Sequence, residues 1–293
     1  MLQILWRVTV FVLAFALIGA LFIVPLASAL SEWADTFPRR AQLYADIVGA
    51  VAILAATWVM TRFVDRRPFR TIGLAPKNAP RDLAAGLTVG VVWLAMSVGG
   101  LWAAGWASPE DPVALSGSLL LVSATSVFFN VLTQQLLLCG YILQTIRSRT
   151  NFHVALLVSA ALFSSYHAGV FQGAWLPAVN VFAAGVLFCL AYVVTGNLWF
   201  PVAMHFAWNL LLGPVFGLTV SGTGKMGLGW RMFTVDGPAL FTGGAFGVEG
   251  GLVVTFSTTL LIFAFVLFRY RQRARVSIEE PARLRVAETP EVR

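Results

Sequence analysis

Between Pro112 and Gly224 the chain carries only two charged side chains, Arg147 and Arg149. Soluble domains carry charges at about a quarter of their positions, so a segment of this length could not cover an aqueous surface. The whole chain of 293 residues is 58% hydrophobic and 11% charged, with a mean hydropathy of +0.81. These features exclude a soluble globular domain and predict a polytopic membrane protein.

The apolar runs predict an all-α membrane helix bundle. A helix needs about 20 apolar residues to cross a bilayer. An alternating pattern typical of a membrane barrel is absent, so the runs are expected to be helices. The first run is too long for the apolar region of a signal peptide and is expected to stay in the protein as a span. The eight predicted spans are residues 4–30, 41–63, 82–105, 117–146, 153–171, 176–195, 198–218 and 248–268.

The arginines and lysines predict the orientation. Eight spans place three basic segments on one side: the loop 62–81, the loop 147–149 and the start of the tail, 269–275. Loops rich in Lys and Arg stay in the cytoplasm, and only Arg39 and Arg40 stand together against this assignment. We therefore expect an integral protein of a bacterial plasma membrane with both termini in the cytoplasm. The net charge of +7 is explained by topology and does not indicate a nucleic-acid partner.

Composition divides the chain into four predicted parts. Two N-terminal spans precede the polar-residue core, and a Gly-rich outer loop precedes the last span. The stretch 213–250 is apolar but too broken for one helix, so we expect it to pack on the outer end of the bundle. The tail alternates Arg with Glu and Pro and is predicted to be a disordered cytoplasmic segment. The four parts are residues 1–65, 66–222, 223–270 and 271–293.

Polar side chains inside three predicted spans mark a candidate site. The fourth span contains Gln134 and Gln135, the fifth ends near His167, and the seventh contains His205 and Asn209. His205 and Asn209 are four residues apart and share one helix face. Polar groups in hydrocarbon serve either helix packing or function. Because two of the chain's three histidines lie in separate spans with polar neighbours, we expect one shared polar pocket.

These residues carry a resemblance to a known family. The segment 134–141, with two Gln followed by Cys139 and Gly140-Tyr141, precedes Phe163-x3-His167 and His205-x3-Asn209. This order resembles the three motifs of the CPBP family, which comprises type II CAAX prenyl proteases, abortive-infection proteins and bacteriocin-immunity proteins. The similarity covers residues 66–222, with the motifs within 117–215. It implies an intramembrane core in which glutamates activate water and the histidines and Asn stabilise the oxyanion.

The chain departs from the family in its first motif. Where the family has Glu-Glu-x3-Arg, this chain has Gln134, Gln135 and Cys139. A carboxamide is not a usable general base near neutral pH. The acids Asp46, Asp82, Asp236 and Glu249 are expected at span ends or in the outer loop. We therefore predict a catalytically silent homologue, a pseudoenzyme that keeps the cavity for binding, immunity or scaffold roles. Its family-site positions are Gln134, Gln135, Cys139, His167, His205 and Asn209.

Several other functions remain open at the level of sequence. An active intramembrane CAAX-type endopeptidase would have to use His167 or His205 as its base. Two His with Asn and Gln are a poor zinc ligand set, so no metal or other cofactor is predicted. The sequence lacks the internal repeats that are typical of many transporters, which disfavours a transport function. A nucleophilic role for Cys139 needs a stabilised thiolate, which an apolar span disfavours, and Cys139 and Cys189 are not expected to form a disulfide. The predicted partners are membrane lipid and a prenylated or hydrophobic membrane peptide.

Overall fold

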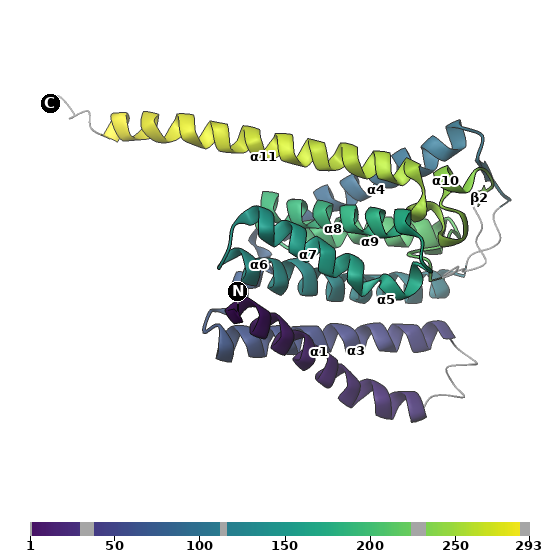
Figure 1. Ribbon diagram of the computed structural model, residues 1–293, viewed down its shortest axis with the longest axis horizontal. Helices are drawn as coiled ribbons and strands as arrows, with labels where there is room; N and C mark the ends of the chain where they lie inside the picture. Colours follow the sequence, from purple (N-terminus) through teal and green to yellow (C-terminus); the bar gives the residue numbers. More distant parts are fainter. Residues whose placement is uncertain (1, 30–37, 112–115, 224–232, 288–293) are drawn as a thin grey trace.

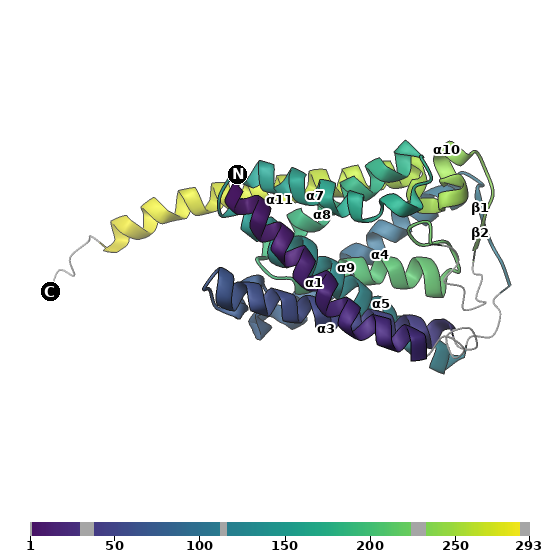
Figure 2. The same ribbon diagram turned by 60° about the horizontal axis from the view of Figure 1, so that its bottom comes forward.

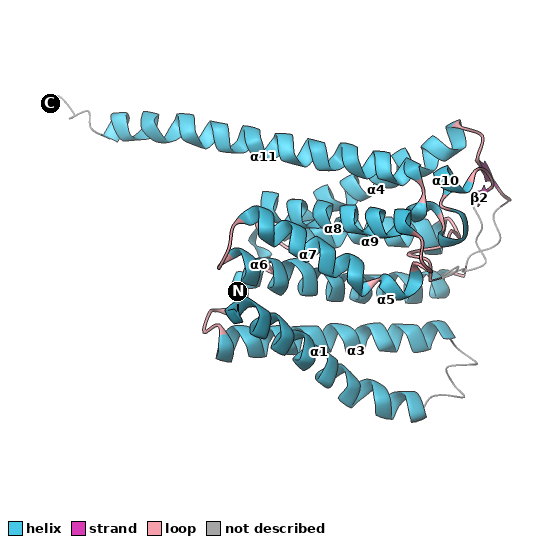
Figure 3. Ribbon diagram, in the orientation of Figure 1, coloured by secondary structure: helices cyan, strands magenta, loops and turns pink. Residues whose placement is uncertain are grey.

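The structure is a computed structural model that describes residues 2–29, 38–111, 116–223 and 233–287. Helices dominate it, and a two-stranded antiparallel sheet pairs Ala107–Pro109 with Phe233–Val235 (Figure 3). The all-α fold class is confirmed. The long helices are α1 (Leu2–Ala29), α3 (Pro38–Val59), α4 (Ala79–Ala103), α5 (Gly117–Gln135), α7 (Phe152–Tyr166), α8 (Trp175–Thr195), α9 (Trp199–Leu210) and α11 (Leu252–Ala287). The short helices are α6 (Leu143–Arg147) and α10 (Ala239–Thr242), and the strands are β1 (Ala107–Pro109) and β2 (Phe233–Val235).

Short turns of other helical types connect these elements. The π-helical turns are η1 (Met60–Val64), η4 (Leu136–Ile142) and η6 (Leu211–Val215). The 3-10 turns are η2 (Phe69–Ile72), η3 (Pro76–Asn78), η5 (Ala168–Val170), η7 (Gly244–Phe246) and η8 (Val248–Gly250).

Each of the eight predicted spans contains a helix, but not every helix is a clear span. Within the described ranges, six helical segments are long and apolar enough to cross a membrane by length and composition. The helix α7 is apolar but only 15 residues long, and α9 with η6 is not among the six. The number of spans, eight, therefore stays a prediction. The apolar helices identify an integral membrane protein.

The helices are arranged in layers, and most of them run along one common direction, while α1 crosses α3 obliquely (Figure 1). The pair α1 and α3 lies on one side of the bundle, α5 to α9 form the centre, and α11 lies on the other side with α4 (Figures 1 and 2). The centre is held by a close contact between α4 and α9. A Cβ atom at Gly86 would lie 2.3 Å from the Phe200 carbonyl oxygen, and one at Gly90 would lie 2.5 Å from that of Met204. Small residues four apart allow this approach of two backbones.

The helix α9 is consequently well enclosed within the bundle. Nine of its residues are buried, His205 and Asn209 among them. Trp208 stacks on Trp93 of α4 with ring centroids 3.9 Å apart. The third sequence motif is thus carried on a helix whose position is fixed on several sides, and rigid elements of this kind hold site geometry better than loops do.

The two ends of the bundle differ in charge. At one end, which we call the basic end, Arg7 of α1 pairs with Asp65, and Arg67 donates to Gln144 Oε1 at 2.8 Å. Arg269 of α11 donates to the Val193 carbonyl at the same end, at 3.2 Å. The N-terminus and the connection from α6 to α7 also lie there (Figure 1). The basic segments predicted to share one side of the membrane are therefore at one end of the molecule.

The opposite end is capped by the stretch that follows η6. Its described parts, 216–223 and 233–250, pack on the bundle through buried Phe246 and Val248. Asn180 of α8 fixes the stretch by donating to the carbonyl oxygens of Glu249 at 2.8 Å and Gly251 at 3.0 Å. We call this the capped end.

The tail differs from its prediction as a disordered segment beginning at residue 271. The helix α11 continues to Ala287 and projects beyond the bundle (Figure 1).

Candidate functional site

The first motif lies where the fourth span changes its helical geometry. The α-helix α5 ends at Gln135, and the next seven residues, Leu136–Ile142, form the π-helical turn η4. Short π-helical insertions are rare and occur frequently at functional sites. Here the change falls between the two glutamines and Cys139. It therefore sets how these side chains are directed into the bundle.

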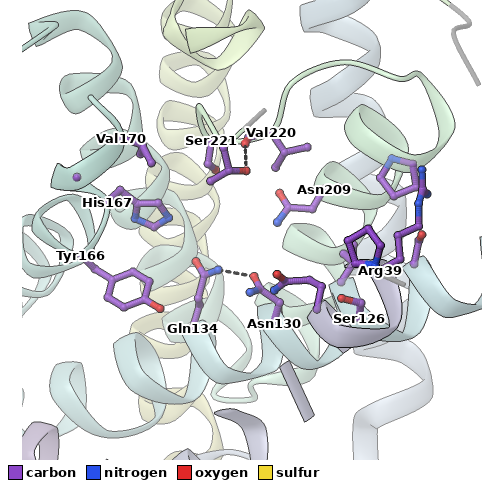
Figure 4. A pocket seen from close by; sticks show the side chains of 17 residues that line it. Arg39, Ser126, Asn130, Gln134, Tyr166, His167, Val170, Asn209, Val220 and Ser221 are labelled. Carbon is purple, nitrogen blue, oxygen red and sulfur yellow. Dashed lines mark hydrogen bonds between the residues drawn. The ribbon is translucent and has the colours of Figure 1, made fainter. Parts of the chain in front are cut away.

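A cavity of about 910 Å³ opens at the capped end of the bundle. Its lining comes from α3, α5, α9 and η6, from the end of α7 with η5, and from the stretch 220–223 (Figure 4). No residue of the basic end belongs to the described lining. The polar side chains that line it are Arg39, Gln42, Ser123, Ser126, Asn130, Gln134, Tyr166, His167, Asn209, Ser221 and Thr223.

Three of the six predicted site residues face this cavity: Gln134, His167 and Asn209. We call them the cavity group. His167 follows α7 directly, and its Nδ1 lies 2.9 Å from the Phe163 carbonyl oxygen. A carbonyl can only accept, so Nδ1 carries the hydrogen and Nε2 of the neutral ring is left as an acceptor. The side-chain oxygens of Gln134 and Asn209 are buried and have no hydrogen-bond partner.

The other three predicted residues, Gln135, Cys139 and His205, form a packed group that is not part of the cavity lining. Gln135 and Cys139 are fully buried, and His205 is 6% exposed. Gln135 Nε2 lies 3.1 Å from His205 Nδ1, and the Cys139 thiol lies 3.5 Å from Gln135 Oε1. The imidazole of His205 stacks on Phe188 with ring centroids 4.5 Å apart. The group is therefore a satisfied polar cluster inside an apolar layer.

Helix geometry explains this division of one expected pocket into two groups. Successive residues on an α-helix point about 100° apart, so Gln134 and Gln135 cannot face the same space. His205 and Asn209 do share a face, but Asn209 is one turn nearer to the capped end, where the cavity opens. The Phe163 ring contacts both histidines, with centroid distances of 4.8 Å to His167 and 6.3 Å to His205. The two groups are neighbours with an aromatic ring beside both.

The structure also brings an acid to the site that the sequence analysis placed at a span end. Asp46 of α3 is only 7% exposed. Its carboxylate accepts from Gln42 at 3.1 Å, from Asn130 at 3.0 Å and from Ser126. All three donors line the cavity. The available sequence signal was the pair Gln42 and Asp46, which are four residues apart on an apolar span and therefore share a face.

A second buried acid, Glu249, fixes the rim of the cavity. Its carboxylate accepts from Trp208 Nε1 at 2.8 Å and from the backbone N–H of Ser221. Ser221 lines the cavity and has a positive φ of 48°, a conformation that few residues other than glycine adopt. Glu249 precedes α11, outside the spanning helices, and burial raises the pKa of its carboxyl group while the two N–H donors oppose that shift.

The arrangement supports hydrogen bonding more readily than metal binding. Across the described parts of the chain, no group of three or more His, Cys, Asp or Glu side chains is placed to hold a metal ion. The described lining contains one cationic side chain, Arg39, and no carboxylate. The fold and the site together define a helical integral membrane protein with a polar cavity at one end.

Comparison with known proteins narrows that class. Residues 116–211 match the family model described as Rce1-like, type II CAAX prenyl endopeptidase Rce1-like. This third of the chain includes all six predicted site residues, and it is similar to the Rce1-like members of the CPBP family. The expected resemblance is therefore confirmed over that segment. No curated protein and no solved structure matches the chain.

Proposed function

We propose that this protein is a catalytically silent CPBP-type membrane protein that binds a prenylated or otherwise hydrophobic membrane peptide in the cavity at its capped end. The observation that carries the proposal is the state of the first motif. Gln134 and Gln135 stand at the positions of the family's two glutamates, and the Gln135 amide is held by His205 and Cys139. Neither amide can take a proton from water as a carboxylate does.

The size and lining of the cavity suit a ligand. Its volume lies within the range of about 300–1,000 Å³ that is usual for ligand sites. Apolar side chains such as Val127, Val170 and Pro214 line it beside the polar ones. A mixed lining of this kind fits an amphipathic molecule, with its polar part at the cavity group. An immunity or scaffold role would use the same binding step.

A second candidate is an active endopeptidase that uses His167 as its base. One observation favours it: the bond from Nδ1 to the Phe163 carbonyl leaves Nε2 of His167 as an acceptor at the cavity. However, the described residues place no carboxylate against this ring to stabilise the imidazolium that would form. A carbonyl partner orients the ring but supplies only a partial charge.

We further propose that the protein lies in a bacterial plasma membrane with the basic end in the cytoplasm. The grouping of Arg7, Arg67 and Arg269 at one end supports this orientation, since cytoplasmic loops carry the excess of arginine and lysine. Reporter fusions at Lys77 and at Arg275 should both report the cytoplasm. A reporter at either position that gives the opposite signal would overturn the orientation.

The proposed function is tested by measuring binding and cleavage on the same preparation. The purified protein in lipid nanodiscs is mixed with a fluorescent prenylated CAAX-type peptide, and both peptide retention and product formation are followed. We expect saturable binding without cleavage, and weaker binding by Gln134→Leu. The variant Gln144→Leu is a matched control, because Gln144 lies at the basic end and does not line the cavity. Cleavage by the parent that is lost in His167→Ala would establish the second candidate instead.

A further inference from the structure

A chain of hydrogen bonds connects Asp46 to the cavity. The Asp46 carboxylate accepts from Asn130 Nδ2 at 3.0 Å, and Asn130 Oδ1 accepts from Gln134 Nε2 at 2.7 Å. Because a carboxylate without a proton can only accept, it fixes which end of the Asn130 amide faces it. That choice in turn fixes the Gln134 amide. Gln134 must donate to Asn130, and its oxygen is left without a partner.

The result is a set of acceptors around the cavity. Oε1 of Gln134 is buried and unpartnered, and Gln134 is only 8% exposed. Oδ1 of Asn209 is also unpartnered, in a residue that is 7% exposed. Nε2 of His167 adds a third acceptor, since its Nδ1 donates to Phe163. A ligand that brings hydrogen-bond donors would satisfy these acceptors.

The same region lacks a positive charge beside its buried acid. The ion pairs found among the described residues are those of Asp65 with Arg7 and with Arg67, so Asp46 has no ion-pair partner there. Arg39 lines the cavity and lies at the start of α3, two helical turns from Asp46. A cation bound at Gln134 would be separated from the Asp46 carboxylate by one residue of the hydrogen-bond chain, Asn130.

We propose that the cavity binds a protonated primary amine on an amphiphilic ligand, and that Asp46 is the residue that positions the site for it. This inference rests on the proposed binding function and names the chemistry of its ligand. The ammonium group donates to Gln134, His167 and Asn209, and the Asp46 charge favours it through Asn130. The amine belongs either to a peptide, as its N-terminus or a lysine, or to an aminophospholipid head group.

Three probes that share a farnesyl tail separate charge from hydrogen bonding. Farnesylamine carries a charge and N–H donors at pH 7, N-acetylfarnesylamine has one N–H and no charge, and farnesyltrimethylammonium has a charge without N–H groups. None contains a peptide bond between amino acids, so the measurement does not depend on cleavage. Binding is measured by calorimetry on the whole protein in phosphatidylcholine nanodiscs. We expect farnesylamine to bind at least about tenfold more tightly than either of the other probes, as one charge-assisted bond allows.

The variant Asp46→Asn removes the charge and keeps most of the shape. We expect the tenfold preference for the amine to fall to near one, while the affinity for N-acetylfarnesylamine changes little. Asp82→Asn is the matched control, because Asp82 is a similarly buried acid, 8% exposed, on a helix that contributes no residue to the cavity lining. It should leave the preference unchanged. If Asp46 only held α3 against α5, Asp46→Asn would lower the affinity for all three probes together. That result would contradict its positioning role.

Gln134→Glu keeps the proposal testable if Asp46→Asn does not fold. It places a charged acceptor in the cavity itself and should increase the preference for farnesylamine over N-acetylfarnesylamine by about tenfold or more. A parent protein that binds the three probes equally, or does not bind farnesylamine, would overturn the proposal.

Two further experiments identify the molecule that supplies the amine. Displacement of farnesylamine by phosphatidylethanolamine in the nanodisc assigns the amine to lipid, and displacement only by a prenylated peptide with a free N-terminus assigns it to peptide.

Discussion

Gln134 and Gln135 are neighbours in the chain and identical in chemistry, yet they have different surroundings. Gln134 belongs to the cavity group and keeps an unpartnered oxygen, whereas Gln135 belongs to the packed group and has a partner at both ends of its amide. Under the proposed function, one position is available to a ligand and the other is a structural contact. The difference follows from helix geometry, which directs two adjacent residues of one motif into different surroundings.

The largest effect is expected when both acids are restored without their cation. In the double variant Gln134→Glu, Gln135→Glu, the fully buried position 135 receives a carboxylate with no counter-ion, and an uncompensated buried charge costs about 3–5 kcal/mol. Adding Cys139→Arg places a cation four residues away and should recover part of this loss. Thermal unfolding in detergent measures both variants.

The same triple variant tests whether the family chemistry can return. With Gln134→Glu, Gln135→Glu and Cys139→Arg together, we expect detectable cleavage of a prenylated CAAX-type peptide, and further addition of His205→Ala should abolish it. Cys139 is fully buried, so the arginine also has to find space against Gln135. A triple variant that folds but stays inactive would show that the peptide groove has diverged too.

The single substitutions separate the two positions directly. Gln135→Glu alone should destabilise the protein by about 3–5 kcal/mol because its carboxylate is enclosed. Gln134→Glu should cost less, about 1–3 kcal/mol, because it loses the bond that Gln134 donates to Asn130 but places its carboxylate beside a polar cavity. The difference between their unfolding temperatures measures the contrast. Equal losses would mean that both positions are enclosed and that the division between the two groups is wrong.

The histidines should differ in the same direction by a smaller amount. His205→Ala removes the stacking on Phe188 and leaves the Gln135 amide without its partner, which should cost about 3 kcal/mol. His167→Ala, at the cavity, should cost about 1 kcal/mol, because one bond to a carbonyl is lost beside an open space. Stability is read from thermal unfolding, and ligand binding should show the opposite ranking.

The smallest effect on stability is expected at Asn209. Its side-chain oxygen has no partner, so Asn209→Leu should change stability by less than about 0.5 kcal/mol while weakening binding of the amine probe. Calorimetry of the variant protein with farnesylamine checks the second part. A large loss of stability without a loss of binding would place Asn209 with the packed group.

The sequence predicted the helical class well because hydrophobicity in a membrane protein is read directly from composition. It also placed the six site positions on three helices. It did not separate the cavity group from the packed group, because that depends on how far each helix is rotated and on the π-helical turn after Gln135. Asp46 was missed for a related reason. Its partners Ser126 and Asn130 lie on another helix, and only the packing of α3 against α5 brings them together.

The placement of the cavity at the capped end has a consequence for delivery. Arg7, Arg67 and Arg269 lie at the other end of the bundle, so in the proposed orientation, with that end in the cytoplasm, the cavity faces the compartment outside the membrane. A ligand would then arrive from the far side, either from the outer leaflet or from the space beyond it, after its own export. In that orientation a prenylated peptide made in the cytoplasm would have to cross the membrane before it could bind. The proposed orientation therefore links the identity of the ligand to a transport step before binding.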